Sequence, residues 1–492
     1  MRKIIYFGGL MALLLGLLSP TGIHPVQAHS AFSCTNVTEI PQTECQALVA
    51  VYNNTNGAGW LNKFNWLITN TPSNWYGVTV QAGHVKYLNL RLNQLSGSIP
   101  PQLGYLNNLE ELYLNINKLT GSIPSELGNL TELRTLDLDH NQFTGSIPPE
   151  LGNLNKLTLL DLSYNKLTGI IPPEFGNLTL LNRLSLNDNQ LSGSLPGELG
   201  NLTNLTIFDL GRNLLTGTIP PELGYLINLE RLYLNINKLT GSIPPELGYL
   251  INLEKLHLNN NKLTGSIPSE LGNLTGLRSL SLSYNQLTGS ILPEVGNLNS
   301  LTYLDLSYNK LTGSIPIELG SLLTLESLHL NSNQLTGNIP PQLGNINTLT
   351  YLYLGNNQLT ESIPPELGNL TSLRWLDMSS NQLTGNIPSE LGNLTLLNRL
   401  YLNDNQLTGN IPPQLGNINT LTYLYLGNNQ LTESIPPELG NLTSLRWLDM
   451  SSNQLTGNIP SEFGNLTLLN RLSLNDNQLS GSLPGELGNL TS

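Results

Sequence analysis

The sequence predicts a repeat solenoid of the α/β class, with a parallel β-sheet on its concave face and little α-helix. Three observations predict it. Most of the 492-residue chain repeats itself every 24 positions, a period in the range of solenoid proteins. Each copy alternates leucine with polar residues over a short stretch, which is the period of a strand with one buried face. Each copy also places an asparagine just after that stretch. Length alone suggests about three domains at ~150 residues each, but an unbroken period indicates one array.

The array begins at Val85 and runs to residue 492 as seventeen copies without insertion or deletion. The asparagine falls at Asn93 and then every 24 residues to Asn477. A side-chain amide is both a donor and an acceptor. Buried at the end of each strand, it can bond turn backbone groups of its own and the adjacent copy. The sequence therefore predicts an asparagine ladder, because an unpaired buried amide costs ~1–3 kcal/mol.

Glycine and proline mark the corners of each predicted coil. The glycine of the L-G pair is present in all seventeen copies. The glycine of T-G-S-I-P is replaced only by Glu361 and Glu433, and the proline after it only by Leu292. Because proline blocks a regular helix and glycine allows a tight bend, we expect extended segments and short 3₁₀ turns on the outer side.

Residues 1–28 are predicted to be a secretory signal peptide. The chain starts Met-Arg-Lys, continues with an apolar run over 4–18, and offers small residues before Ala28. The alternative is a membrane anchor, but the run is shorter than the ~20 residues that span a bilayer. No other apolar stretch approaches that length, so we expect no membrane span after cleavage and a secreted, extracellular or cell-surface protein.

Residues 29–84 are predicted to cap the first coil. Cys34 and Cys45 are the only two cysteines, and in an oxidising compartment they are expected to form a disulfide. A free nucleophile or a metal pair is the alternative, but no histidine lies between them. No metal site and no cofactor are expected.

The repeat L-x-x-L-x-L-x-x-N-x-L-T-G-x-I-P-x-x-L-G-N-L resembles the plant-type, 24-residue class of leucine-rich repeat. That class occurs in ectodomains of plant receptor-like kinases and in polygalacturonase-inhibiting proteins, with relatives among bacterial secreted proteins. The resemblance implies a horseshoe or superhelix and a binding function without catalysis. The segments 47–52 and 75–79, with Trp60 and Trp66, resemble the N-terminal cap of the family.

The chain departs from the family pattern at both ends. The family usually places cysteines just before and after the W-x-G-V segment, where this chain has Ser73 and Val80. The cap is therefore expected to pack over the first coil with one disulfide rather than two. No capping sequence follows the last copy, so its leucine layer is expected to be exposed unless something covers it. A partner or a second copy of the chain could do so, which would allow self-association through the last repeat.

The concave positions carry an unusual share of aromatic side chains. Twelve of the 18 tyrosines lie at the five outward positions of the strands, together with two tryptophans. Exposed aromatic residues on one surface suggest a recognition face. The alternative is that aromatic residues suit strands and pair across them. The richest set, which we name the aromatic stripe, comprises Tyr351, Tyr353, Trp375, Tyr401, Tyr423, Tyr425 and Trp447.

A second candidate is an acidic patch of Asp137, Asp139 and Asp161. Asp137 and Asp161 occupy the same column of adjacent strands, ~5 Å apart. That spacing suits a cation or paired acid chemistry. The alternative is a solvated ladder of acids interleaved with arginines at 134, 183 and 212.

Several function classes can be excluded or set aside. A net charge of -13 argues against nucleic-acid binding. His257 and His329 share a column but are three strands apart, ~14 Å, and no Ser–His–Asp set can be assembled. We therefore expect a non-catalytic protein that recognises a protein, peptide or glycan through its concave face. The alternative is a structural or adhesive surface protein without a specific ligand.

Overall fold

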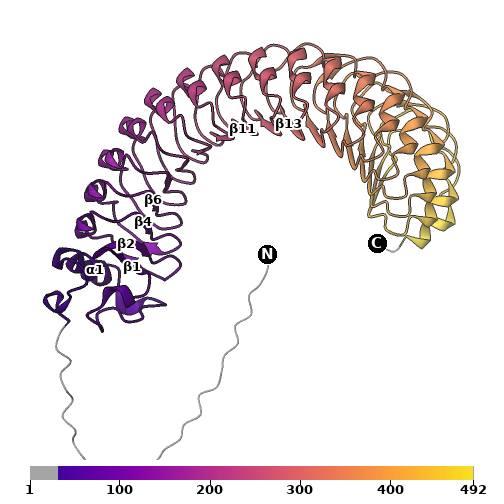
Figure 1. The fold of residues 1–492 in the computed structure, drawn as a ribbon. Coiled ribbons are helices and arrows are strands. Elements are labelled where there is room, and N and C mark those ends of the chain that lie inside the picture. Colours follow the sequence, from indigo (N-terminus) through magenta and orange to yellow (C-terminus); the bar gives the residue numbers. More distant parts are fainter. Residues whose placement is uncertain (1–31, 491–492) are drawn as a thin grey trace, which may run out of the picture.

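The computed structural model describes residues 32–490, which form a long curved solenoid whose sheet lies on the inner side of the arc (Figure 1). The predicted signal peptide, residues 1–28, lies outside the described residues. The sheet has eighteen strands in chain order; the first two pair antiparallel and all later neighbours pair parallel. The strands are β1 (Val78–Gln81), β2 (His84–Asn89), β4 (Glu111–Tyr113), β6 (Thr135–Asp137), β7 (Leu159–Asp161), β8 (Arg183–Ser185), β9 (Ile207–Asp209), β10 (Arg231–Tyr233), β11 (Lys255–His257), β12 (Ser279–Ser281), β13 (Tyr303–Asp305), β14 (Ser327–His329), β16 (Tyr351–Tyr353), β18 (Trp375–Asp377), β19 (Arg399–Tyr401), β21 (Tyr423–Tyr425), β23 (Trp447–Asp449) and β24 (Arg471–Ser473).

Each strand from β4 onward is three residues long and turns its middle residue into the core. Leu112, Leu136 and Leu160 are partners in adjacent strands, and all three are fully buried. The residues on either side of them face the concave surface. The constant 24-residue offset keeps this register throughout, so side chains of the same repeat position form columns across the sheet. The predicted solenoid with an inner parallel sheet is confirmed.

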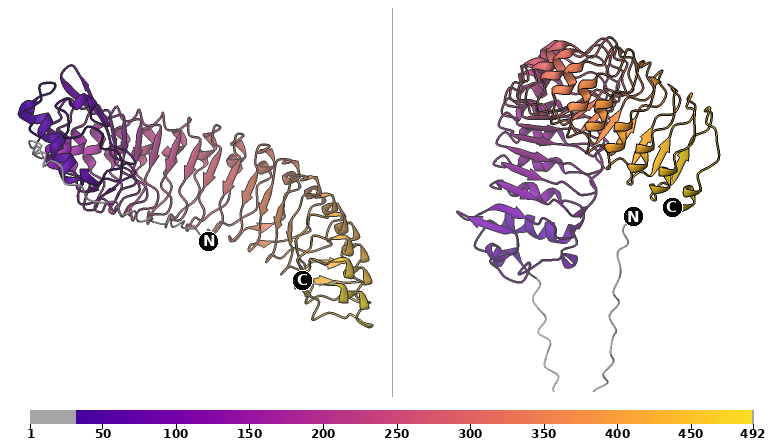
Figure 2. Two further views of the ribbon diagram at one scale, coloured as in Figure 1. Left: turned by 90° about the horizontal axis from the view of Figure 1, so that it is seen from below. Right: turned by 90° about the vertical axis from the view of Figure 1, so that its right-hand side faces the viewer.

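The outer side of every coil is a 3₁₀ helix, as the glycine and proline pattern predicted. These helices are η4 (Pro101–Tyr105), η5 (Ser125–Asn129), η6 (Pro149–Asn153), η7 (Pro173–Asn177), η8 (Gly197–Asn201), η9 (Pro221–Tyr225), η10 (Pro245–Tyr249), η11 (Ser269–Asn273), η12 (Pro293–Asn297), η13 (Ile317–Ser321), η14 (Pro341–Asn345), η15 (Pro365–Asn369), η16 (Ser389–Asn393), η17 (Pro413–Asn417), η18 (Pro437–Asn441), η19 (Ser461–Asn465) and η20 (Gly485–Asn489). Figure 2 shows that the stack of coils also twists into a superhelix.

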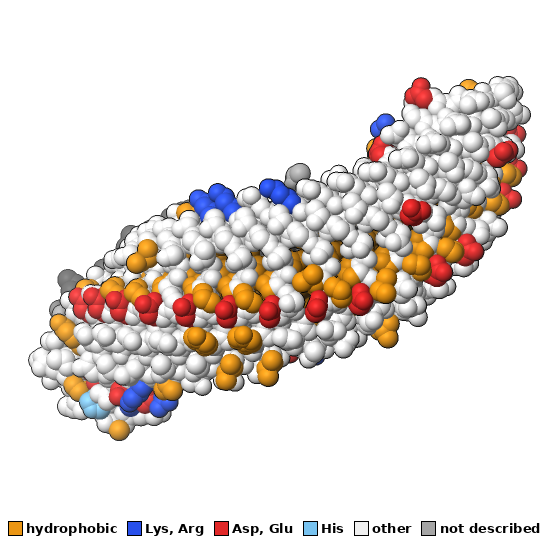
Figure 3. Space-filling model, turned by 90° about the horizontal axis from the view of Figure 1, so that it is seen from above, with side chains coloured by type: hydrophobic (Ala, Val, Ile, Leu, Met, Phe, Trp, Pro, Cys, Tyr) orange, Lys and Arg blue, Asp and Glu red, His pale blue; other side chains and the backbone are white. Residues whose placement is uncertain are grey.

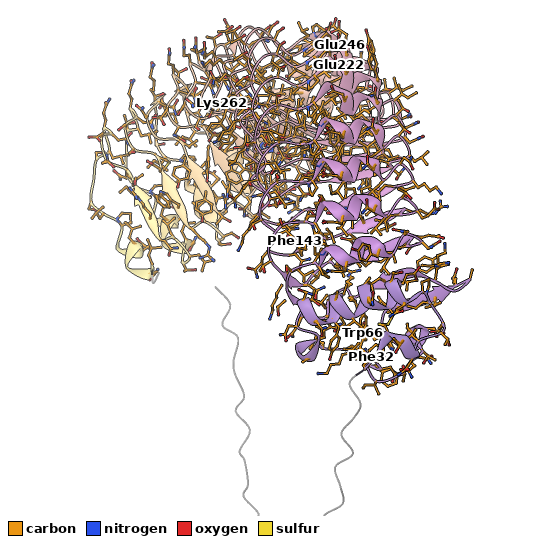
Figure 4. The ribbon with its side chains drawn as sticks, turned by 90° about the vertical axis from the view of Figure 1, so that its left-hand side faces the viewer. Phe32, Trp66, Phe143, Glu222, Glu246 and Lys262 are labelled. Carbon is orange, nitrogen blue, oxygen red and sulfur yellow. A yellow bond between two sulfur atoms is a disulfide. The ribbon has the colours of Figure 1, made fainter. Side chains whose placement is uncertain are left out.

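The outer face carries a row of acidic side chains, nearly one for each coil (Figure 3). Glu222 on η9 and Glu246 on η10 are neighbours in this row and lie on adjacent 3₁₀ helices in Figure 4. The acidic side chains of this row therefore face away from the concave surface.

Three pairs of two-residue strands run along one edge of the coils: β3 (Ser96–Gly97) with β5 (Lys118–Leu119), β15 (Thr336–Gly337) with β17 (Gln358–Leu359), and β20 (Thr408–Gly409) with β22 (Gln430–Leu431).

The asparagine ladder is present. The side-chain nitrogen of Asn285 donates to the carbonyl oxygens of Leu258 and Leu282, each at 3.0 Å. Its oxygen accepts from the backbone N–H of Leu263 at 3.0 Å. The same pattern recurs in neighbouring coils, for example at Asn261. Each amide thus joins its own coil to the preceding one and satisfies backbone groups that the turn leaves unpaired.

The residue before each ladder asparagine adopts a left-handed backbone conformation. Its φ lies between 48° and 57° from Leu92 to Asp476, whatever the side chain. Two of these residues, Ile116 and Ile236, are β-branched and are unfavourable in this conformation. Glu361 and Glu433, which replace glycine, also have positive φ values of 63° and 62°. The packing of the repeat therefore holds a left-handed backbone even at residues for which this conformation is unfavourable.

The N-terminal segment closes the first coil with a helix and an aromatic cluster. The helix α1 (Gln42–Asn54) packs on η4 and contacts two short 3₁₀ helices, η1 (Cys34–Asn36) and η2 (Gly57–Gly59), while a third, η3 (Pro72–Asn74), contacts β1. Trp66 has ring centroids of Trp60 and Trp75 at 4.9 and 5.0 Å. Figure 4 shows Trp66 and Phe32 at this end of the molecule.

Polar contacts tie this segment together. Cys34 and Cys45 form a disulfide with a Cα–Cα distance of 5.7 Å, so the predicted pairing is confirmed. Ser73, which replaces a cysteine of the family pattern, donates hydrogen bonds from its N–H and hydroxyl to the carboxylate of Glu39. Buried Glu44 accepts from the N–H of Val85 at 2.8 Å, which joins α1 to the first strand of the array.

Candidate functional site

The aromatic stripe lies on five neighbouring strands, β16 to β23, and six of its seven rings form an unbroken chain of contacts. Ring centroids are 6.3 Å apart for Tyr351 and Tyr353 and 4.9 Å for Tyr353 and Trp375. The chain continues through Tyr401 and Tyr425 to Trp447, with steps of 5.7, 4.8 and 5.6 Å. The rings therefore pair across strands, as the structural alternative expected, and they also form one continuous surface.

This surface is half-buried rather than fully exposed. Tyr351 is 39% exposed, and Trp375 and Trp447 are covered in part by their neighbours. Burial raises the pKa of Tyr353 to about 12, so its hydroxyl stays neutral at physiological pH. The indole N–H groups of Trp375 and Trp447 are buried and make no hydrogen bond to a described residue. Two donors thus remain unused within the stripe.

The seventh ring, that of Tyr423, joins the stripe through an arginine. The guanidinium carbon of Arg399 lies 4.1 Å from the ring centroid of Trp375 and 5.0 Å from that of Tyr423. Arg471 lies 4.6 Å from the ring of Trp447 in the same way. Both arginines are functional candidates that the sequence analysis missed. The signal was available, because Arg399 stands between Trp375 and Tyr423 in one column of the repeat.

A cavity of about 630 Å³ opens beside this part of the stripe. Its lining includes Trp375, Arg374 and Arg399, and the hydrogen-bonding side chains of Asn398 and Thr422. None of the residues that line it is acidic. The site thus combines flat aromatic surface, two cations and neutral polar groups, which suits a ligand with anionic and hydroxyl or amide groups.

The residues of the acidic patch lie close together, but Asp161 is paired with other side chains and does not share a ligand site with Asp137. Asp137 and Asp161 are register partners in β6 and β7, as predicted. Asp161 is used locally: it accepts from the Ser163 hydroxyl at 2.6 Å and from Arg183 at 3.2 Å. Arg212 lies 3.8 Å from Asp188. Arginines therefore interleave with these acids, as the alternative interpretation expected.

Asp137 differs from four of the equivalent aspartates in other coils. Asp161, Asp305, Asp377 and Asp449 each accept a hydrogen bond of 2.6 Å from a serine hydroxyl two residues later. After Asp137 that serine is replaced by Asp139, so two carboxylates face each other. Burial, and then the charge of Asp139, raise the pKa of Asp137 to about 7. This pair stores electrostatic repulsion that the serine-containing coils avoid.

The pair makes stability depend on pH. Because the folded pKa of Asp137 lies above its ordinary value of 3.8, the folded chain binds more protons than the unfolded chain between these values. Stability from this group is complete below about pH 4 and is lost as pH rises through about 7. We expect Asp139→Ser to reduce the loss of unfolding free energy between pH 5 and 8 by about 1–2 kcal/mol after discounting for partial exposure, and so to flatten the fall of the melting temperature over that range.

The control for this pH measurement is Glu174→Ser on the outer face, which also removes one carboxylate. Thermal melts of both variants and of the unchanged chain, followed by circular dichroism across the pH range, compare the slopes. An Asp139→Ser slope equal to that of the unchanged chain would show that the pair carries no proton linkage.

The histidines of the concave face lie apart, on β11 and β14. Burial lowers the pKa of His257 and of His329. Among residues 32–490, no group of three or more histidine, cysteine or acidic side chains is placed to hold a metal ion. His329 instead extends the ring contacts of the stripe, with a centroid distance of 4.5 Å to Tyr353.

Models of leucine-rich repeats match most of the array. Models described as leucine-rich repeat or leucine-rich repeat region match residues 83–143, 156–178, 180–202, 204–226, 227–287, 282–410, 395–455 and 468–490. A solenoid with a concave parallel sheet and these repeats is a leucine-rich-repeat protein, and this chain belongs to that family. No curated protein matches the chain.

Solved structures resemble the chain over most of its length. A TDR receptor is 37% identical with a TM-score of 0.77, covering 81% of this chain and 69% of its own. The plant peptide hormone receptor RGFR1, solved in complex with RGF2, is 32% identical with a TM-score of 0.56 and covers 85% of each chain. A leucine-rich-repeat protein of Leptospira interrogans is 34% identical with a TM-score of 0.56, covering 78% and 88%.

Proposed function

We propose that the protein is a non-catalytic binding protein that recognises a protein, peptide or glycan through its concave face. The continuous contact chain of the aromatic stripe, with the cavity beside it, carries the proposal. Large rigid rings around a pocket are the side chains that dominate recognition surfaces. The similarity to a peptide hormone receptor solved with its ligand supports the same role.

We also propose that the protein acts outside the cell, either secreted or at the surface. The predicted signal peptide and the disulfide both support export. Within residues 32–490, the structure contains no helix whose length and hydrophobicity would let it cross a membrane. Under this proposal residues 29–84 act as the cap of the array in residues 85–492.

The aromatic stripe can be tested by removing its two tryptophans. We expect Trp375→Ala combined with Trp447→Ala to weaken binding of the ligand at least about tenfold, because buried aromatic residues are typical hot spots. The full chain is screened against a glycan array and a peptide library, and the affinity of each hit is then measured for both proteins by interferometry.

The matched control is Tyr249→Ala, which removes an exposed ring from the outer face. Circular dichroism and melting temperature show that each variant is folded. A hit that binds the double variant as tightly as the unchanged chain would remove the stripe from the site. If neither panel yields a specific hit, the alternative of a structural or adhesive protein replaces the binding proposal.

A further inference from the structure

The aromatic stripe contains the same arrangement twice: an arginine whose guanidinium lies over the ring of a tryptophan on the preceding strand. We call each such pair an arginine subsite. Residues 337–400 and 409–472 are identical except for Leu391 against Phe463. The structure shows what this copying does at the surface. Arg399 covers the ring of Trp375, and 72 residues later Arg471 covers the ring of Trp447. Arg374 and Arg446 precede the two tryptophans in the same way. The two subsites lie three strands apart, which is ~14 Å at the usual strand spacing.

The arginines of these subsites have no acidic partner. Arg183, Arg212 and Arg278, in the earlier coils, each lie within 4.0 Å of an aspartate or glutamate. In contrast, none of the four arginines at 374, 399, 446 and 471 forms an ion pair with a described residue. Their charges are therefore available to a ligand, in a protein whose overall charge is negative.

The geometry of Arg399 suits an oxyanion. Its guanidinium carbon lies over the rings of Trp375 and Tyr423, which belong to the strands on either side, so stacking holds the side chain in place. A planar guanidinium that is already fixed binds carboxylate or sulfate with two parallel hydrogen bonds and loses little side-chain entropy. The arrangement thus presents a preorganised anion receptor rather than a mobile surface charge.

The rest of the cavity suits a sugar chain more than a peptide. Asn398, Thr420 and Thr422 line it with amide and hydroxyl groups. Their donors already bond one another and neighbouring carbonyls, so their oxygens are the atoms that can accept from the hydroxyls of a glycan. Leu396 is the one aliphatic side chain among the lining residues, and the rest of the apolar wall is the aromatic surface of Tyr351 and Trp375, on which a sugar ring can stack. Two subsites built on the same pair of arginine and tryptophan at a fixed spacing also favour a ligand that repeats its own charged groups. Only the first subsite has a second ring, that of Tyr423, and the cavity beside it.

We propose that the duplicated subsites bind an anionic polysaccharide, with each stacked arginine holding one carboxylate or sulfate of the chain. This inference rests on the proposed binding function and names its ligand class. A polymer that reaches both subsites gains affinity because the second contact is intramolecular. An oligomer too short to reach ~14 Å engages one subsite only.

The test measures binding of the full chain by calorimetry to a polyuronate, a sulfated dextran, neutral dextran and poly-glutamate at one fixed salt concentration. We expect binding to the polyuronate, the sulfated dextran or both, and none to neutral dextran. The polyuronate and sulfated arms distinguish carboxylate from sulfate. Arg399→Gln and Arg471→Gln should each weaken binding of the long polymer about tenfold. For a short oligomer, Arg471→Gln should cost at most about twofold, because the subsite of Arg399, which has two rings, remains.

The matched control is Arg278→Gln, which removes the same charge from a concave arginine that already has a partner in Glu254. It should leave affinity unchanged, and melting temperatures should show that all variants are folded. An equal loss in the control would reduce the effect to net charge and overturn the proposal. Binding of poly-glutamate alone would make the ligand an acidic peptide, which overturns the glycan but keeps the binding function. If no polyanion binds, the inference fails, while the tryptophan test still decides the binding function.

Discussion

Replacing Asn285 with alanine should destabilise the array by about 3–5 kcal/mol, because several buried backbone groups lose their partners at once. The N–H of Leu263 loses its acceptor, and the carbonyls of Leu258 and Leu282 lose a donor, all at 3.0 Å. Asn285 is only 8% exposed, so water cannot readily replace the amide. The backbone groups belong to two adjacent coils, which means that the contact between coils weakens as well as the turn.

For Asn285→Ala, the shape of the unfolding curve should change as well as its midpoint. A solenoid is stabilised by contacts between nearest neighbours, so a weak interface near its middle divides it into two parts that unfold separately. Urea denaturation followed by circular dichroism should therefore show two transitions where the unchanged chain shows one. Hydrogen exchange should locate the loss of protection at residues 258–285.

Asn273→Ala provides the control for the ladder. Asn273 ends the 3₁₀ helix η11 on the exposed outer side, so its loss should change stability by less than about 0.5 kcal/mol. Asn285→Asp separates the two roles of the amide, because a carboxylate still accepts from Leu263 but cannot donate to the carbonyls. If Asn285→Ala unfolds at the midpoint of Asn273→Ala, the ladder contributes nothing that water cannot supply.

The fold could be predicted because every coil repeats the same physical solution. A buried leucine such as Leu112, a ladder asparagine and two corner glycines recur at fixed offsets, so one copy explains the others. The pairing of Cys34 with Cys45 followed from their number and the expected compartment. The left-handed backbone at Ile116 was not predicted, because its side chain argues against it and only the neighbouring coils enforce it.

The candidate site could be predicted only in part. The columns of the repeat placed the rings of the stripe on neighbouring strands, and strand register brought them into contact. The stacking of Arg399 depends on side-chain directions that a column alone does not give. The Asp137 and Asp139 pair was seen as two acids, but the direction of its pKa shift required the burial of Asp137 and the serine partners of other coils. Stacking and pKa shifts that depend on side-chain contacts therefore could not be predicted from the sequence.

Replacing Gly272 with alanine should cost about 2–3 kcal/mol, although alanine is normally the better residue in a helical turn. A methyl group on Gly272 would lie 2.5 Å from the carbonyl oxygen of Glu294 and 2.8 Å from its Cβ. Glu294 belongs to the next coil, so the clash forces two coils apart. The backbone of Gly272 is not left-handed, which means that packing alone causes the loss.

Gly488→Ala is the matched control, because Gly488 occupies the same repeat position and no atom of residues 32–490 lies within 4 Å of an added methyl group beyond its chain neighbours. There we expect no loss, or a gain of up to about 0.5 kcal/mol from the reduced freedom of the unfolded chain. Denaturant midpoints of the two variants, measured together, isolate the approach of one coil to the next. Equal changes at both positions would show that this glycine serves the bend of its own coil and not the contact between coils. A loss at Gly272 alone would explain why the L-G glycine occurs in every copy. The T-G glycine has a positive φ and is replaced by Glu361 and Glu433, which keep the same left-handed backbone.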